Sequence, residues 1–268
     1  MFKRPPLHQI HHGSIIIPRA TFRHFTTSPP LRVPPTDRAD FFHHFLTTTP
    51  PPQDSITYFS SSPWTSLILS DPTYEPLPFY SRHPLPTTEN AIFSTLSTPT
   101  TIPHLLALRR RDLRTPSPLT PGVPTTKPAL VLPEVLALLA LRPGLNAHPG
   151  ICHGGFQGVI LDEITRFLIL AHHDNVLQGL EGEEGERRRR GPRERHFTLK
   201  WEVEYLAPVT TPRDVLVRAQ LVRRVGRKWV CGADVVDQEG RVLVRGESLW
   251  VTAKGKGEES GEGGGGGE

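Results

Sequence analysis

Apolar and polar positions form regular patterns mainly in the second half of the chain. From Phe156 onward, apolar residues recur at helical spacing for about five turns, which predicts one long helix over about residues 155–173. From Phe197 to Tyr205, apolar and polar residues alternate strictly, which predicts a strand with one buried and one solvated face. The same alternation predicts three more strands over residues 215–221, 229–235 and 242–252, with turns between them.

An almost wholly apolar run, Ala129 to Leu141, precedes the helix and is interrupted by Pro133. We interpret Glu134 to Leu141 as the first strand, although a helix also fits a short apolar run. One strand, one long helix and four antiparallel strands together predict an α+β fold, in which an antiparallel sheet packs on one central helix.

The first half of the chain carries weaker signals. Residues 29–63 are rich in proline and threonine and are expected to be linker, with one short helical turn at Phe41, Phe42 and Phe45. The remaining expectations are an extended arm over 62–80, helices over 88–96 and 103–112, a proline-rich linker over 115–128 and a mobile surface loop over 179–195. We divide the chain into a leader and disordered linker (1–60), an N-terminal arm with short helices (61–128), the α+β domain (129–253) and a disordered Gly/Glu tail (254–268).

Composition narrows the possible functions. The 268 residues include 29 prolines and 23 glycines, and only 36% are hydrophobic, which favours one folded core with unpacked flanks. The net charge of +4 is mild, and the basic run Arg187–Arg190 lies beside glutamates, so we expect no nucleic-acid partner.

No apolar run reaches the ~20 residues of a membrane span. Two cysteines are too few for a disulfide framework. We expect no metal site, because the adjacent His43 and His44 would point in different directions on a helix and no Cys, Asp or Glu set completes a site. We also expect no cofactor.

The N-terminal residues resemble a targeting segment. Residues 1–36 contain no Asp or Glu but carry several Lys and Arg residues, as mitochondrial presequences do. The run from Arg23 to Thr26 resembles a matrix-protease cleavage site. Prolines would, however, interrupt the amphipathic helix that such peptides need. We expect a mitochondrial protein; the alternative is a disordered proline-rich leader on a cytoplasmic protein.

The loop that leads into the long helix is the main candidate for chemistry. Its glycines allow the backbone to turn sharply and to approach a ligand closely. The helix then starts at His153-Gly154-Gly155, where unpaired backbone N–H groups and the helix dipole favour an oxyanion. Asp162 follows nine residues after His153, in a helix that is apolar on nearly every side. A carboxylate in such a position indicates a functional role.

This spacing resembles the HGG-x(6)-D signature of hotdog-fold acyl-CoA thioesterases, the superfamily that includes phenylacetyl-CoA and 4-hydroxybenzoyl-CoA thioesterases and their fungal-type relatives. His153, Gly154, Gly155 and Asp162 match the motif, and Asn146–Gly150 is similar to the polar loop before it. The resemblance implies a hotdog fold, in which a curved antiparallel sheet wraps around the long helix, here with a proline-rich N-terminal extension. It also implies a hydrolase that cleaves acyl-CoA or acyl-carrier-protein thioesters to free acid and thiol. The strand order predicted above agrees with this fold independently of the motif.

Thioester hydrolysis requires a polarised carbonyl oxygen and an activated water. We expect Asp162 to act as the general base, and the backbone N–H groups of Gly154 and Gly155 to form the oxyanion hole. The alternative for Asp162 is a structural ion pair with Arg166 one turn later. The alternative base is Glu163, which lies about 100° around the helix and cannot face the same substrate.

The resemblance also suggests supporting residues. We expect His153 to orient the loop, Asn146 to bind the water or the carbonyl, and Thr198 to position the water, as a Ser or Thr does in related enzymes. The alternative for Thr198 is an outward-facing strand residue. Cys152 beside the motif is expected to be a small apolar filler, and the alternative is a nucleophile.

Candidate substrate-binding residues come from several parts of the chain. They are His148, Gly158 (where alanine is expected), Glu163, and Arg224 and Lys228 near strand ends for the phosphates of coenzyme A. The competing function is a hotdog module that binds acyl thioesters without hydrolysing them.

Helix geometry predicts the oligomeric state. Gly154 and Asp162 are eight residues apart, which is about 12 Å along a helix. An oxyanion donor and a base must both lie within a few ångströms of one carbonyl carbon, so one chain cannot supply both. Two such helices packed antiparallel about a two-fold axis would bring the two groups together. We therefore expect a homodimer, or a dimer of dimers, with shared sites.

Overall fold

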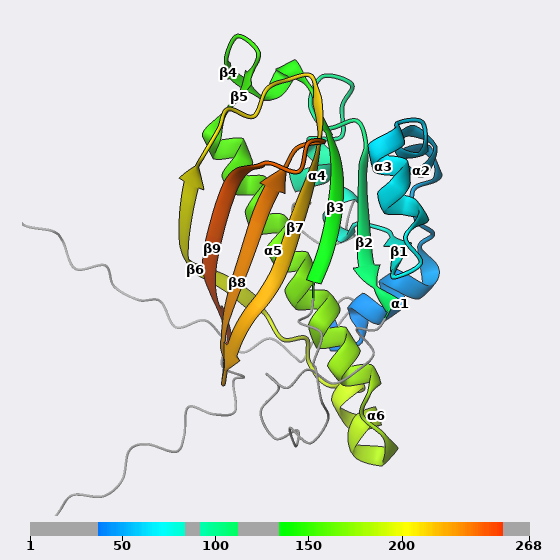
Figure 1. Ribbon diagram of the computed structural model, residues 1–268. Helices are drawn as coiled ribbons and strands as arrows, with labels where there is room; N and C mark the ends of the chain where they lie inside the picture. Colours follow the sequence, from blue (N-terminus) through cyan, green and yellow to red (C-terminus); the bar gives the residue numbers. More distant parts are fainter. Residues whose placement is uncertain (1–36, 84–91, 112–133, 254–268) are drawn as a thin grey trace, which may run out of the picture. The chain divides into compact units, whose positions relative to one another are not determined.

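An antiparallel sheet of seven strands forms the framework of the computed structural model (Figure 1). The structure describes residues 37–83, 92–111 and 134–253. The strands lie in the order β1-β2-β3-β7-β8-β9-β6. Their bounds are β1 Tyr74–Leu77, β2 Leu105–Arg110, β3 Glu134–Leu141, β6 His196–Tyr205, β7 Arg213–Val225, β8 Lys228–Val236 and β9 Val242–Thr252.

Contacts divide the chain into two units, Met1–Arg32 and Val33–Glu268, and all the described residues belong to the second. Four segments with expectations lie outside the described residues. They are the leader, the start of the helix expected from residue 88, the linker over 115–128 and the Gly/Glu tail. The expectations for those segments therefore stay predictions.

One long helix, α5 (Gly154–Gln178), crosses one face of the sheet (Figure 1). Its buried apolar side chains, which include Ile160, Ile164 and Leu168, share one hydrophobic cluster with the inward residues of β3, β7, β8 and β9. These residues repeat at helical spacing, so the pattern in the sequence becomes the contact surface with the sheet. The packing of an antiparallel sheet on one long helix confirms the predicted α+β hotdog fold.

The apolar run at residues 134–141 is strand β3, as expected. Every residue from Val135 to Leu141 is buried, because α5 covers one face of this part of the sheet and two short helices cover the other. These are α2 (Gln53–Ser60) and α3 (Pro63–Ser70), which pack on the outward residues Leu136 and Leu138. A strand that is covered on both faces has no polar face, which is why its sequence alone could not exclude a helix.

The N-terminal helix α1 (Phe41–Thr48) packs on α5 through aromatic rings. The Phe42 ring lies edge-on to the Phe167 ring of α5 with a centroid distance of 5.5 Å, and Phe79 stacks on the same Phe167 ring at 4.7 Å. Such ring pairs add to the free energy gained from burial alone. Residues 41–60, expected to be mainly linker, instead form α1 and α2 and contribute to the core.

Three local expectations were wrong. The helix expected over 103–112 contains strand β2, because residues 105–109 pair with β3 and residues 107–110 pair with β1. Residues 105–108 are buried on both faces. The extended arm over 62–80 contains α3 before β1. The surface loop expected over 179–195 contains helix α6 (Gly182–Arg190), which is supported by Glu184–Arg187 and Glu186–Arg190 ion pairs one turn apart.

Strand β6 also departs from expectation. The alternation over residues 197–205 predicted one buried face, yet Phe197, Leu199 and Tyr205 are 53%, 55% and 56% exposed. Two causes combine: β6 is the last strand of the sheet, and a bulge between Thr198 and Lys200 shifts its register against β9. Only Trp201 and Val203 of this strand pack against the core.

Short elements complete the described structure. Their bounds are η2 Tyr80–Arg82, α4 Ile92–Thr95, η4 Pro143–Leu145, β4 Asn146–His148 and β5 Ile151–Cys152. Strands β4 and β5 pair with each other and carry the loop that enters α5 (Figure 1).

Candidate functional site

The carboxylate of Asp162 lies between helix α5 and strand β6. One of its oxygens, Oδ1, accepts a hydrogen bond from Thr198 Oγ1 at 2.8 Å and another from Trp201 Nε1 at 2.6 Å. The structure thus brings together two residues that the sequence singled out, Asp162 and Thr198. It adds Trp201, which the sequence analysis missed because strict alternation assigned that residue to a purely apolar face.

Asp162 and its neighbour Glu163 face different surroundings. Glu163 lies near Ser81 of η2, and burial raises the pKa of this carboxyl, while Ser81 and Arg166 act in the opposite direction. Among the described residues Asp162 forms no ion pair with Arg166, so the structural alternative for this carboxylate is not observed. Only Asp162 is held by hydrogen bonds from the edge strand.

The start of α5 is capped by the motif itself. His153 is the N-cap residue, and its Nδ1 accepts a hydrogen bond from the Gly155 N–H at 2.8 Å. Within the described part of the chain, the Gly154 N–H has no acceptor. Of the two glycines expected to bind an oxyanion, Gly154 is therefore the one whose N–H is available in this conformation.

Tyr205 at the end of β6 closes over the helix start. Its hydroxyl donates to the Gly154 carbonyl oxygen at 3.0 Å. A Cβ added at Gly154 would approach the Tyr205 ring to 3.2 Å, so the glycine permits this close contact. Strand β6 consequently runs alongside the first half of α5, with Tyr205 beside Gly154 and Thr198 beside Asp162.

The polar loop before the helix is fixed by the segment between β6 and β7. Asn146 Oδ1 accepts a hydrogen bond from Thr211 Oγ1 at 2.5 Å, and the Thr211 N–H donates to the Gly150 carbonyl oxygen at 3.0 Å. Gly150 has φ of 73°, a value that glycine adopts at little cost. His148 is exposed. The side-chain oxygen of Asn146, which was expected to bind the water or the carbonyl, therefore already accepts a hydrogen bond from Thr211 in this conformation.

The other candidate substrate-binding residues lie apart from one another. A Cβ added at Gly158 would meet no atom within 4 Å, so the helix surface one turn before Asp162 is open. The Arg224 guanidinium lies 4.0 Å from the ring centroid of Trp229, and Lys228 is exposed at the start of β8. Through the register of β7, β8, β9 and β6, Arg224 stands three strands away from Thr198.

Cys152 does not have the properties of a nucleophile. Its side chain is buried, and burial raises the pKa of the thiol to about 11. A thiol with so high a pKa is almost entirely protonated near neutral pH. This agrees with the expected role of an apolar filler.

The region around Asp162 matches a known protein family. Residues 149–244 match the family model of the Thioesterase superfamily. This region belongs to the thioesterase superfamily. It includes the start of α5, Asp162, Thr198 and Trp201.

Solved structures similar to the thioesterase region come from several organisms. A hypothetical thioesterase from Streptococcus pneumoniae TIGR4, in a structure with coenzyme A, is 18% identical with a TM-score of 0.35, over 45% of this chain and 78% of that one. Thioesterase superfamily member 2 from Mus musculus is 11% identical with a TM-score of 0.34, over 44% and 74%. The E. coli PaaI protein from the phenylacetic acid degradation operon is 13% identical with a TM-score of 0.35, over 46% and 74%. The search of curated proteins found no match.

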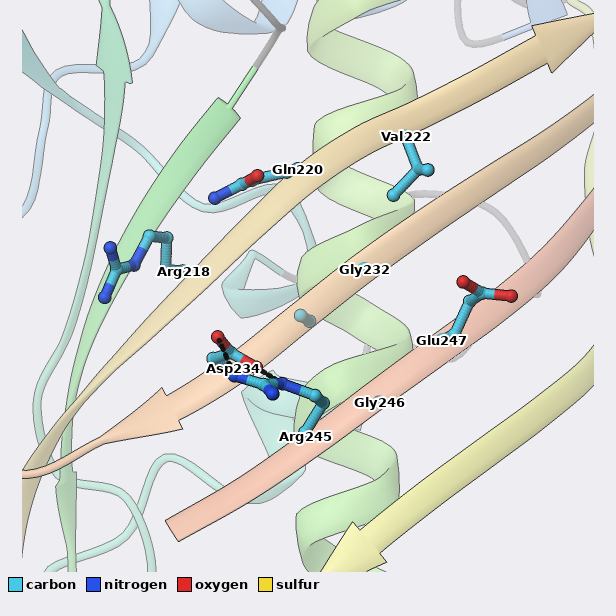
Figure 2. A pocket seen from close by; sticks show the side chains of 9 residues that line it. Arg218, Gln220, Val222, Gly232, Asp234, Arg245, Gly246 and Glu247 are labelled. Atoms are coloured by element: carbon cyan, nitrogen blue, oxygen red, sulfur yellow. Dashed lines mark hydrogen bonds and ion pairs between the residues drawn. The ribbon is translucent and has the colours of Figure 1, made fainter. Parts of the chain in front are cut away.

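The hollow on the outer face of the sheet does not contain candidate catalytic groups like those around Asp162. A hollow over β7, β8 and β9 is lined by an Arg245–Asp234 ion pair and by residues such as Arg218 and Glu247, none of them a candidate catalytic group (Figure 2). Among the described residues, no group of three or more His, Cys, Asp or Glu side chains is placed to hold a metal ion. None of the described helices is long and apolar enough to span a membrane.

Proposed function

We propose that this protein is an acyl thioester hydrolase that cleaves acyl-CoA or acyl-carrier-protein thioesters to free acid and thiol. The observation that carries the proposal is the Asp162 carboxylate on the central helix of a thioesterase-superfamily region, held at one oxygen by Thr198 and Trp201. A fixed carboxylate with a second, unengaged oxygen is suited to remove a proton from water.

In the proposed reaction Asp162 takes a proton from a water molecule as the water oxygen bonds to the thioester carbonyl carbon. The carbonyl oxygen becomes an oxyanion that a backbone N–H of a helix start, that of Gly154 first, would stabilise. When the carbonyl re-forms, the carbon–sulfur bond breaks and the leaving sulfur receives the proton from Asp162. The open helix surface at Gly158 leaves room for the acyl group beside the base.

The proposed active unit is a dimer. Gly154 and Asp162 occur on one helix, eight residues or about 12 Å apart, so the N–H and the base that act on one substrate are assigned to different chains. Strand β6 supports a second copy at this edge, because it is a ten-residue edge strand with exposed Phe197, Leu199 and Tyr205 side chains. Exposed edges of this length are usually covered in proteins.

The test of the function is release of free thiol from a panel of acyl-CoA and acyl-carrier-protein thioesters. Asp162→Asn should lower the rate about 100-fold or more, because loss of a general base typically costs that much. Asp214→Asn, on the same sheet but bonded to Tyr58, is a matched control that should retain the parental rate. If Asp162→Asn hydrolyses thioesters at near the parental rate, another residue is the general base, and Glu163 is the first to test.

The shared site has its own test. Gly154→Pro removes the N–H at the first position of α5, where the proline backbone fits a helix start and the Tyr205 ring has to move by a few tenths of an ångström. A refolded mixture of Gly154→Pro and Asp162→Asn chains should recover up to about a quarter of the parental activity, since half of the dimers would hold one complete site. No recovery despite demonstrated subunit exchange would contradict the shared site.

The competing function is an acyl-thioester binding module without turnover. The arrangement of donors around Asp162 favours hydrolysis over this alternative, because binding alone does not require a fixed carboxylate on an apolar helix. Tight binding of acyl-CoA without thiol release, across the whole panel, would establish the binding module instead.

A further inference from the structure

Two donors converge on a single oxygen of Asp162. Thr198 Oγ1 and Trp201 Nε1 both bond to Oδ1, at 2.8 and 2.6 Å. Among the described residues, no donor reaches the other oxygen, Oδ2. The carboxylate is therefore held on one side and left free on the other.

The two donors can reach the same oxygen only because of an irregularity in β6. Side chains along a strand alternate between faces, so residues three apart normally point in opposite directions. The bulge between Thr198 and Lys200 inserts one extra residue, and Thr198 and Trp201 then both face α5. Without the bulge, Thr198 and Trp201 would face opposite sides of the sheet.

A glycine on the neighbouring strand fixes the position of the indole. A Cβ added at Gly246 of β9 would lie 2.7 Å from Trp201 Cζ3, which is shorter than any real contact of this kind. The same Cβ would lie 3.2 Å from Leu161 Cδ1 of α5. The ring therefore fills the space that the missing side chain leaves between sheet and helix, and its N–H points at Asp162.

We propose that Trp201 is a positioning residue, whose indole N–H holds Asp162 Oδ1 so that Oδ2 faces the attacking water. This role rests on the proposed hydrolase function, because it matters only if Asp162 Oδ2 takes a proton from water. An indole N–H can only donate, so it fixes the orientation of the carboxylate and cannot itself accept the proton. A threonine hydroxyl can also accept, so Thr198 alone does not fix which oxygen of Asp162 stays free.

The first experiment follows the carboxyl directly and does not depend on turnover. The aspartate carboxyl carbons are labelled with ¹³C, and the Asp162 signal is assigned from its loss in Asp162→Asn. In Trp201→Phe, which keeps an aromatic ring but removes the N–H, the Asp162 carboxyl signal should move from its parental position at one fixed pH, because the carboxylate loses a hydrogen bond. The matched control is Trp250→Phe, which removes a buried indole N–H bonded to Ser248 Oγ at 2.9 Å on the same sheet and should leave the Asp162 signal in place.

The second experiment moves the indole without removing it. Gly246→Ala should displace the Trp201 ring and move the Asp162 carboxyl signal in the same direction as Trp201→Phe. If Gly246→Ala does not fold, Trp201→Phe decides alone. An unchanged Asp162 signal in a folded Trp201→Phe protein overturns the positioning role.

Turnover then separates this role from the proposed function. With a hydrolysed thioester, Trp201→Phe should lower kcat about 10- to 100-fold and change KM less than about twofold. Absence of thiol release by the parental chain would refute the hydrolase, whereas the carboxyl signal would still show whether Trp201 holds Asp162. An unchanged kcat in Trp201→Phe would refute the positioning role alone.

Discussion

The contact between α1 and α5 gives a quantitative prediction about the N-terminal arm. Phe42 is only 2% exposed and packs edge-on against Phe167, five residues after Asp162 on the same helix. Replacing a buried phenylalanine by alanine typically costs about 3–5 kcal/mol, from lost burial and the cavity left behind. We therefore expect Phe42→Ala to lower the free energy of unfolding by about 3–5 kcal/mol, of which the ring pair accounts for about 0.5–1.5 kcal/mol.

The assay is denaturant unfolding of the full chain, followed by circular dichroism and tryptophan fluorescence. Leu67→Ala is the matched control, because this leucine of α3 is 73% exposed and its loss should change stability by less than about 0.5 kcal/mol. A double-mutant cycle of Phe42→Leu and Phe167→Leu should yield a coupling of about 0.5–1.5 kcal/mol. A Phe42→Ala cost near that of Leu67→Ala would refute the docking of α1 on the central helix.

Three further predictions concern the histidine near the end of α5, the buried thiol and the leader. Burial lowers the pKa of His172 to about 4 from 6.5, so between pH 6 and pH 5 the unfolded chain binds a proton that the folded chain does not. The free energy of unfolding should therefore fall by about 1 kcal/mol over that interval because of this group. In urea unfolding measured at pH 6 and pH 5, His172→Leu should show a smaller fall than the parental chain. An equal fall in the two proteins would contradict the lowered pKa of His172. Cys152→Ala should retain thioester turnover, and Cys152 should react with a thiol reagent only after unfolding; rapid labelling of the native protein would disprove its burial. A fluorescent fusion of residues 1–40 should enter mitochondria, and a diffuse cytosolic signal would reject the leader as a presequence.

The sequence alone determined the elements whose signals are local. The helix from Gly154 follows from apolar spacing and a glycine start, and strands β7, β8 and β9 follow from alternation between turns. Asp162 and Thr198 could be singled out because the first lies at a motif spacing and the second matches a position suggested by the family resemblance, and both are properties of the chain itself.

The assignment of two strands and the docking of helix α1 could not be predicted locally, because they depend on contacts between distant parts of the chain. Strand β2 was taken for a helix, and β3 could not be told from one, because burial on both faces removes the alternation that marks a strand. The docking of α1 through Phe42 required Phe167 and Phe79 from distant parts of the chain. Such contacts have no local signature in the sequence.

Trp201 illustrates the difference most clearly. Alternation assigns it to the same face as Phe197 and Leu199, yet the two latter side chains are exposed while the indole reaches Asp162. The bulge in β6 changes which residues share a face, and the place of a bulge is set by pairing with β9 rather than by β6 itself. The space at Gly246 then decides where the ring can lie. The sequence determined that a carboxylate would stand on the central helix, and only the pairing of strands decided which side chains hold it.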